Sequence, residues 1–268
     1  MRFTANKNRR PLIWAAVLLL IPIGAAVYCV MPRYEQYTAM GEIVPVRDIG
    51  VDGSVNFVYV REGITRNLFE KWTAARSYPD ARFTPADPWV EDVLDFEMDA
   101  GEDLRDEVIQ RAVDSAEQYA EENLGESERR TRLDSLIEQT ADYYGDSIGL
   151  MLGIGLVEEA LHENFSIHPF GTYCIAGTGT LEDDHTVGSV GAIRDKLRTA
   201  EQAGADYFFV PKDKDRYPYE GLSNEEEAFQ VKQELNLHLR IVPVDTLEEA
   251  VDFLKNLPKS PLLEESRP

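Results

Sequence analysis

Two stretches decide the fold: Gly145-Asp146-Ser147-Ile148-Gly149-Leu150-Met151 and Val187-Gly188-Ser189-Val190-Gly191-Ala192-Ile193-Arg194-Asp195-Lys196. The first predicts a turn that places a serine at the start of an apolar helix. The second predicts a turn followed by a helix that carries a lysine. Between them, residues 173–181 are rich in β-forming residues and end in a polar hairpin. The region is therefore expected to alternate helix and strand.

Lys196 occupies an unusual place on its helix. At about 100° per residue it falls inside the apolar arc, beside Ala200 and Ala203. A lysine held among apolar groups loses hydration, which lowers its pKa and suits it to act as a general base. The alternative is a lysine that runs along the edge of the core to water. The opposite side of the helix is expected to be polar and holds Arg194, Asp195, Arg198, Glu201 and Gln202.

Ser147 also has more ordinary explanations. Asp146 and Ser147 are common N-cap residues before an apolar helix. The Gly-x-Ser-x-Gly spacing from Gly145 to Gly149 also matches the nucleophile elbow of α/β-hydrolases. That fold requires several strands before the elbow, and too little strand-like sequence precedes Ser147. It also requires a catalytic histidine, and none of the four has a convincing setting: His162, His168, His185 and His238.

Taken together, these motifs resemble those of the Lon-type serine peptidases. Residues 145–151 are similar to the family's Gly-Pro-Ser-Ala-Gly-Leu-Met serine motif. Residues 175–181, followed by 187–193 and Lys196, resemble the block that ends in the family's catalytic lysine. The resemblance is strong from about residue 140 to 257, and it is closest to the membrane-tethered, extracytoplasmic Lon-like peptidases of bacteria. It implies an α/β (α+β) fold with a mixed sheet and flanking helices.

The resemblance also implies roles for single residues. Ser147 would be the nucleophile and Lys196 the base that takes its proton. Thr178 and Thr180 would line the site or bind the lysine. The substrate and oxyanion region would comprise Gly145, Asp146 and Ile148, with the helix N-terminus directing N–H groups towards an oxyanion.

Four residues depart from the family pattern near the reactive groups. Asp146 and Ser189 replace proline, Ile148 replaces alanine and Ala192 replaces glycine. An aspartate that faced Lys196 would stabilise the ammonium form and weaken the base. We expect Asp146 to point away instead, as a helix N-cap.

Composition limits the partners and cofactors. The formal net charge of −22 disfavours nucleic acid, because phosphates would be repelled. No Cys or His spacing predicts a metal site and no phosphate-binding loop predicts a nucleotide site, so no cofactor is expected. The expected partners are therefore a peptide or unfolded protein as substrate, the membrane, and further copies of the chain in a homo-oligomer. Residues 126–144 are too few for the PDZ domain that many relatives carry, and substrate recruitment is left open.

The N-terminus predicts a membrane anchor. Four basic residues precede residue 11, and residues 11–31 carry no charge. This run is long enough to cross a bilayer, and the basic flank favours a cytoplasmic N-terminus with the C-terminal domain extracytoplasmic. A cleaved signal peptide is the alternative. Residues 1–32 are thus expected to form the cytoplasmic terminus and single-pass anchor in the cell membrane.

The remaining chain is expected to hold one Lon-like domain at 33–258, followed by a disordered tail at 259–268. Within that domain, 33–128 would form a strand hairpin and an amphipathic helix, and 129–258 the catalytic core. The following elements are expected: strands 42–46 and 55–60, helix 104–124 ended by Gly125, strand 207–210, helix 224–235, strand 239–244, and helix 246–257 with a Thr246–Glu249 capping box.

The predicted function is a membrane-anchored, ATP-independent serine endopeptidase that cleaves peptides or unfolded proteins with Ser147 and Lys196. No ATPase module accompanies the predicted domain. The alternative is a catalytically inactive Lon-like fold that binds peptides or a membrane partner.

Overall fold

The computed structural model describes residues 9–121, 124–168, 171–212 and 221–257. The chain divides into two compact units, of which the first holds residues 1–39 and 62–92 and the second holds 40–61 and 93–268. The predicted disordered tail, 259–268, lies outside the described residues. The residues singled out above as a candidate site all belong to the second unit.

The first unit contains helix α1 (Arg9–Val30), helix α2 (Leu68–Ser77) and strand β3 (Arg82–Pro85). Strand β3 pairs antiparallel with the start of β1 (Glu35–Pro45). No secondary structure was predicted for residues 61–88. The start of α2 nevertheless has a recognisable N-cap residue, because Asn67 Oδ1 accepts from the Glu70 N–H at 3.0 Å. Among the described residues, no helix has the combined length and hydropathy required to cross a membrane.

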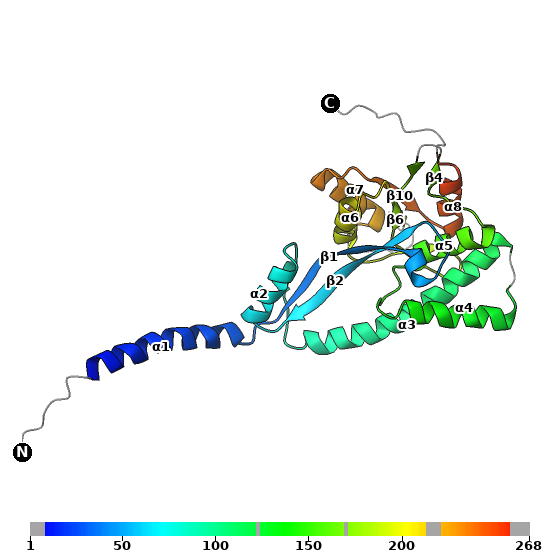
Figure 1. The fold of residues 1–268 in the computed structure, drawn as a ribbon. Helices are drawn as coiled ribbons and strands as arrows, with labels where there is room; N and C mark the ends of the chain where they lie inside the picture. The colour runs from blue at the N-terminus through cyan, green and yellow to red at the C-terminus, as the bar shows by residue number, and fades with distance from the viewer. Residues whose placement is uncertain (1–8, 122–123, 169–170, 213–220, 258–268) are drawn as a thin grey trace, which may run out of the picture. The chain divides into compact units, whose positions relative to one another are not determined.

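A sheet forms the centre of the second unit. Strands β1 and β2 (Asn56–Thr65) are neighbours in it, as the predicted hairpin requires. Three shorter strands follow in the order β6 (Ile175–Gly177), β9 (Tyr207–Pro211) and β10 (Arg240–Val244), each parallel to its neighbour. The antiparallel β1–β3 pair makes the whole sheet mixed. The predicted mixed α/β architecture is therefore confirmed (Figure 1).

Helices cover both faces of this sheet (Figure 1). Phe208 and Val210 point to one face, where they pack with α6 (Ile193–Gln202) and α7 (Asn224–Leu235). Tyr207 and Phe209 point to the other face, against α3 (Val90–Ala120), α5 (Gly149–Leu161) and α8 (Leu247–Lys255). This alternation follows from the two-residue period of a strand, and strands buried on both faces read as continuous apolar runs.

The helices that pack on the second face correct some predicted boundaries. Helix α3 (Val90–Ala120) begins earlier than the predicted residue 104, since acidic residues hide its helical period. It ends before a left-handed residue, Glu121, and Gly125 instead precedes α4 (Glu126–Gln139). Helix α5 (Gly149–Leu161) follows Ser147 as predicted.

Helix α8 (Leu247–Lys255) starts as the sequence predicted, with one difference. Thr246 Oγ1 accepts from the Glu249 N–H at 3.1 Å, so the predicted cap is present. The Glu249 carboxylate accepts from the Asp245 N–H at 2.7 Å, one residue before the position that a capping box requires. The helix is therefore fixed at two successive backbone positions.

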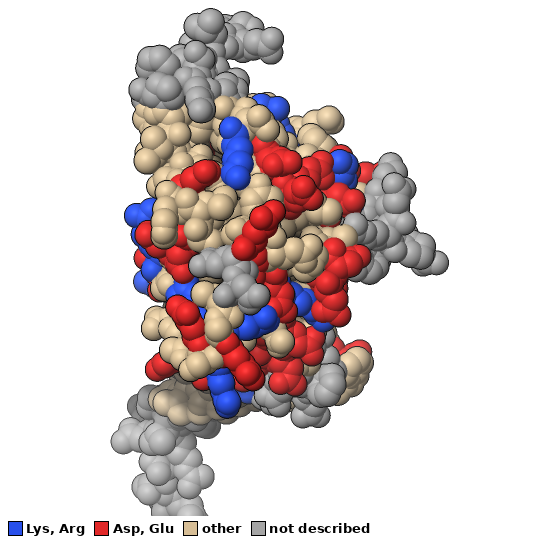
Figure 2. Space-filling model, turned by 90° about the vertical axis from the view of Figure 1, so that its right-hand side faces the viewer, with Lys and Arg blue, Asp and Glu red and all other residues tan. Residues whose placement is uncertain are grey.

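Short elements complete the second unit. They are the 3-10 helix η1 (Val46–Ile49), the β4 (Ile167–His168) and β5 (Gly171–Thr172) pair, and the hairpin of β7 (Thr180–Leu181) and β8 (Val187–Gly188). Acidic side chains predominate on the face in Figure 2, in accord with the net charge.

Candidate functional site at the start of helix α5

A tight turn places Ser147 immediately before α5. Gly145 adopts a left-handed conformation with φ of +83°, in which a residue with a side chain would be strained. Its N–H donates to Gly101 O of α3 at 2.8 Å, so the turn is held against that helix. Ser147 itself is only half-buried, whereas Ile148 and all residues of the next helical turns are buried. The serine thus stands at the boundary between solvent and core.

The turn is joined to the chain just after β6. The Gly179 N–H donates to Ser147 O at 3.1 Å, and the Leu150 N–H donates to Gly179 O at 2.9 Å. Gly149 allows this approach, because a Cβ there would lie 2.4 Å from Val108 Cγ2 and 2.9 Å from Leu181 N. The glycine spacing of the motif therefore has a packing reason that is independent of catalysis.

Lys196 reaches the same place from α6. Its side chain is only 4% exposed, which excludes the alternative of a lysine extending to bulk water. Lys196 Nζ donates to Thr178 Oγ1 at 3.0 Å, and Thr178 Oγ1 donates to Ser147 O at 3.3 Å. The fully buried Thr178 hydroxyl therefore bridges the lysine and the serine turn, and the structure brings together three of the predicted site residues.

The start of α6 is fixed by its neighbours. The Asn224 side-chain amide, at the start of α7, donates to Val190 O at 2.9 Å and accepts from the Val190 N–H at 2.8 Å. Ala192 then adopts a left-handed conformation with φ of +58°. This is the position at which the resemblance led us to expect glycine, the residue that tolerates such a backbone.

Two details of the predicted lysine environment are wrong. Ala203 is exposed and leaves α6 before it can line the lysine. Asp195 was expected on the polar side, yet it is only 1% exposed. Its carboxylate pairs with Arg198 at 3.1 Å.

Asp146 does not cap α5 as we expected. The N-cap position is Ile148, whose side chain has no acceptor, and the first two N–H groups of the helix bind the backbone oxygens of Asp146 and Gly179 instead. Burial raises the pKa of the Asp146 carboxyl above its ordinary value. Its own backbone, the charge of Lys196, the hydroxyl dipole of Thr180 and the charge of Arg111 act in the opposite direction on this pKa. Asp146 therefore lies within electrostatic reach of the lysine.

The two remaining expectations concern Thr180 and the oxyanion. Thr180 is 3% exposed, and its hydroxyl side chain acts to lower the pKa of the Asp146 carboxyl. The N–H groups of Gly149 and Leu150 are already bound to Asp146 O and Gly179 O. These two amides are thus not free to bind an oxyanion. The predicted oxyanion-binding role of the helix N-terminus therefore does not extend to them.

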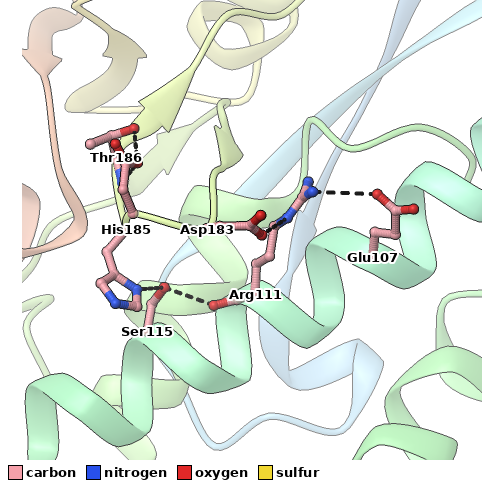
Figure 3. Close-up of polar contacts among 7 residues, drawn as sticks. Glu107, Arg111, Ser115, Asp183, His185 and Thr186 are labelled. Carbon is pink, nitrogen blue, oxygen red and sulfur yellow. Dashed lines mark hydrogen bonds and ion pairs between the residues drawn. The ribbon is translucent and has the colours of Figure 1, made fainter.

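Sequence reasoning missed a polar cluster that links α3 to the β7–β8 hairpin (Figure 3). Arg111 Nε donates to Asp183 Oδ1 at 2.7 Å, and His185 Nδ1 lies 2.8 Å from Ser115 Oγ. The Ser115 hydroxyl donates to Arg111 O at 2.7 Å, so His185 Nδ1 must be the donor in the Ser–His contact. Together with the burial of Ser115, this excludes a nucleophile–base role and makes the cluster a clamp on the hairpin.

No metal site accompanies these residues in the part of the chain that the structure describes, where no three His, Cys, Asp or Glu side chains are grouped to hold an ion. The chemistry of the site thus rests on a half-buried hydroxyl, a buried amine and a neighbouring carboxyl. In comparisons with known proteins, the sequence matches no protein-family model and no curated protein.

Proposed function

We propose that the chain is a Lon-like serine endopeptidase that uses Ser147 and Lys196 without ATP. The observation that carries this proposal is the buried Lys196 amine, linked through Thr178 to the turn that bears Ser147. Burying an amine costs free energy, which a residue with a purely structural role could avoid.

The proposed chemistry has two half-reactions. Neutral Lys196 takes the proton from Ser147 Oγ while this oxygen attacks a peptide carbonyl, and the lysine returns the proton to the leaving amine. Water then attacks the acyl-enzyme carbonyl while Lys196 accepts a proton from it. The bond between the acyl group and Ser147 Oγ breaks, the carboxylic acid product leaves, and Lys196 returns the proton to Ser147 Oγ. Thr178 would hold the amine in place through its hydroxyl. Substrates would be short peptides or unfolded segments, because no unfolding module is part of the predicted domain.

The proposed location is the cell membrane, with the peptidase unit outside the cytoplasm. This rests on the uncharged run of residues 11–31 and on the described apolar side chains of α1, which are largely exposed. Large apolar side chains that surround a helix without protein cover favour a lipid environment. Assembly into homo-oligomers is part of the same proposal and rests on the resemblance alone.

The proposal is tested by degradation of an unfolded protein such as casein with the full-length chain, in the absence of ATP. Ser147→Ala and Lys196→Ala should each abolish cleavage while circular dichroism shows the fold retained. Ser135→Ala and Lys212→Ala are matched controls at exposed positions and should leave the rate unchanged. Cleavage that persists undiminished in Lys196→Ala would show that the mechanism is wrong.

One observation favours a second candidate, an inactive fold that binds peptides. Asp146 and Lys196 interact electrostatically, and an ionised Asp146 stabilises the ammonium form that cannot act as a base. In that case wild type and Ser147→Ala would bind unfolded peptide equally well, and neither would cleave it. Peptide binding measured beside cleavage in the same samples separates the two candidates.

A further inference from the structure

Helix α2 presents an aromatic stripe to solvent. Phe69, Trp72, Thr73 and Arg76 are exposed at i, i+3, i+4 and i+7, which places them on one face of the helix. Phe69 is 58% and Trp72 59% exposed. Their rings lie 6.3 Å apart, and the Arg76 guanidinium lies 5.7 Å from the centre of the Trp72 ring. Two large aromatic side chains therefore form a contiguous patch with a basic group at one end.

The other side of α2 is fixed within the first unit. Lys71 Nζ lies 4.9 Å from the centre of the Phe83 ring and forms an ion pair with Glu35. Arg33 also pairs with Glu35, at 3.4 Å. The stripe is thus held outward by contacts on the opposite side of the helix.

The start of α2 is tied to the end of α1. The Arg33 N–H donates to Arg66 O at 2.7 Å, and Arg33 follows α1 by only three residues. Because both helices belong to the first unit, α2 lies close to the point where α1 ends. A membrane containing α1 would therefore have its surface near α2.

The charge around α2 differs from that of the whole chain. The segment from Arg66 to Pro85, counting both ends, contains four basic and two acidic residues, whereas the whole chain carries a formal charge of −22. Aromatic side chains combined with Lys and Arg are typical of the interface between lipid and water. Basic groups in that position also attract anionic headgroups.

We propose that α2 lies in the phospholipid headgroup layer, with Phe69 and Trp72 inserted at its edge and Arg76 among the phosphates. This placement rests on the anchoring role proposed for α1. Insertion of α2 would fix the orientation of the first unit relative to the bilayer, whereas a unit attached through α1 alone could rotate freely.

Brominated lipids test this placement in the full-length chain reconstituted into anionic vesicles. Trp14→Phe and Trp89→Phe leave Trp72 as the reporter, because the chain has three tryptophans. Bromines near the headgroups should quench Trp72 emission about two-fold more than bromines at the bilayer centre, since interfacial helices insert only shallowly. Trp72 should also be shielded from the aqueous quencher acrylamide.

A second reporter separates failure of the anchor from failure of the α2 placement. Ile21→Trp in a chain with all three natural tryptophans replaced by Phe should be quenched most by bromines at the bilayer centre. If this reporter responds and Trp72 is open to acrylamide and insensitive to both lipids, α1 is anchored and the α2 placement is wrong. If neither reporter responds to lipid, the anchor itself is wrong.

Two further outcomes bear on the occupant of the stripe. Trp72 shielded from acrylamide but insensitive to both lipids would show a protein cover, such as a second copy of the chain, and would overturn the proposal. Arg76→Glu should lower the quenching of Trp72 by headgroup-proximal bromines about two-fold. Arg130→Glu makes the same charge change at an exposed position in the second unit and should have no effect.

Discussion

The two ends of α5 differ in how a buried ionisable group is hydrogen-bonded to its surroundings. At its C-terminal end, the Glu158 carboxylate is 1% exposed and accepts from Ser54 N at 2.6 Å, Ser54 Oγ at 2.5 Å and Phe165 N at 2.6 Å. At its N-terminal end, the half-buried Ser147 is joined through Thr178 to the buried Lys196 amine. The first arrangement joins three backbone segments, whereas the second leaves Ser147 partly exposed to solvent.

The difference predicts opposite consequences of substitution. A carboxylate that satisfies several buried donors is a structural group, so its loss should reduce stability. A buried amine costs stability, so the loss of Lys196 should reduce the proposed activity instead of stability.

The largest expected effect is on activity. Lys196→Met should lower the peptidase rate about 10³-fold, since a general base contributes roughly 10² to 10⁴. Its free energy of unfolding should stay within about 1 kcal/mol of wild type or rise, because an apolar side chain of similar length replaces a buried charge. Initial rates on casein and chemical denaturation measure the two quantities. If Lys196→Met lost much stability but kept full activity, Lys196 would be the structural group, and the role proposed for it would be wrong.

The next effect is on stability at the other end. Glu158→Gln should reduce the free energy of unfolding by about 2 to 3 kcal/mol, because the amide of Gln cannot accept from all of the buried donors. Cleavage per folded molecule should be retained. Glu163→Gln, on the loop after α5, is an exposed control of the same chemistry and should have little effect. Denaturation midpoints at fixed pH measure the difference.

Glu158 should also give stability a pH dependence of definite sign. Burial raises its pKa in the folded protein above the ordinary value of 4.5. The folded state then binds a proton more tightly than the unfolded state, so this contribution is present below the ordinary pKa and is lost as pH rises through the folded pKa. The free energy of unfolding of wild type minus that of Glu158→Gln should therefore decrease with rising pH above about 4.5. Chemical denaturation at several pH values measures this difference. A difference that increases would contradict the sign.

A smaller effect concerns the pH profile of the candidate site. Asp146→Asn removes the carboxylate that stabilises the Lys196 ammonium, so the acid limb of the pH–rate profile should move to lower pH by about one unit or less. Asp142→Asn removes an equal charge from an exposed position nearby and should leave the profile in place. A shift to higher pH would mean that Asp146 itself takes part in proton transfer.

The smallest effect tests the backbone before Lys196. Ala192→Gly should stabilise the fold by about 0.5 to 1 kcal/mol, because glycine relieves the left-handed conformation at φ of +58°. Ala203→Gly, at the other end of the same helix with φ of −78°, should destabilise by a similar amount. Thermal unfolding should show a higher midpoint than wild type for Ala192→Gly and a lower midpoint for Ala203→Gly. Midpoint shifts of the same sign would exclude strain at Ala192.

Local sequence signals predicted much of this fold. Ser223 and Thr246 cap α7 and α8 where the sequence placed helix starts, and Gly204 ends α6 in the left-handed conformation that favours glycine. The apolar run at Tyr207 to Pro211 forms a strand buried on both faces. These features depend on neighbours within a few residues, so pattern alone identifies them.

The candidate site was predicted only in part, because its details depend on distant contacts. The period of α6 placed Lys196 among apolar residues, but it could not show that Asp195, on the other side of the helix, would also be buried by distant parts of the chain. The capping preference of Asp146 was overridden by backbone bonds from Gly149 to Asp146 and from Leu150 to Gly179. The Arg111–Asp183 contact joins residues far apart in sequence and had no local signal.

The bridge through Thr178 has a consequence for the life of the chain before it is folded. Its two hydrogen bonds span 31 and 18 residues, and the Thr178 N–H is itself bound to Phe209 O of β9 at 3.0 Å. The link between serine, threonine and lysine therefore consists of non-local contacts, which require loop closure before they can form. A chain that has not yet folded would carry the proposed reactive groups apart from each other, and so could not use them to cleave other copies of itself.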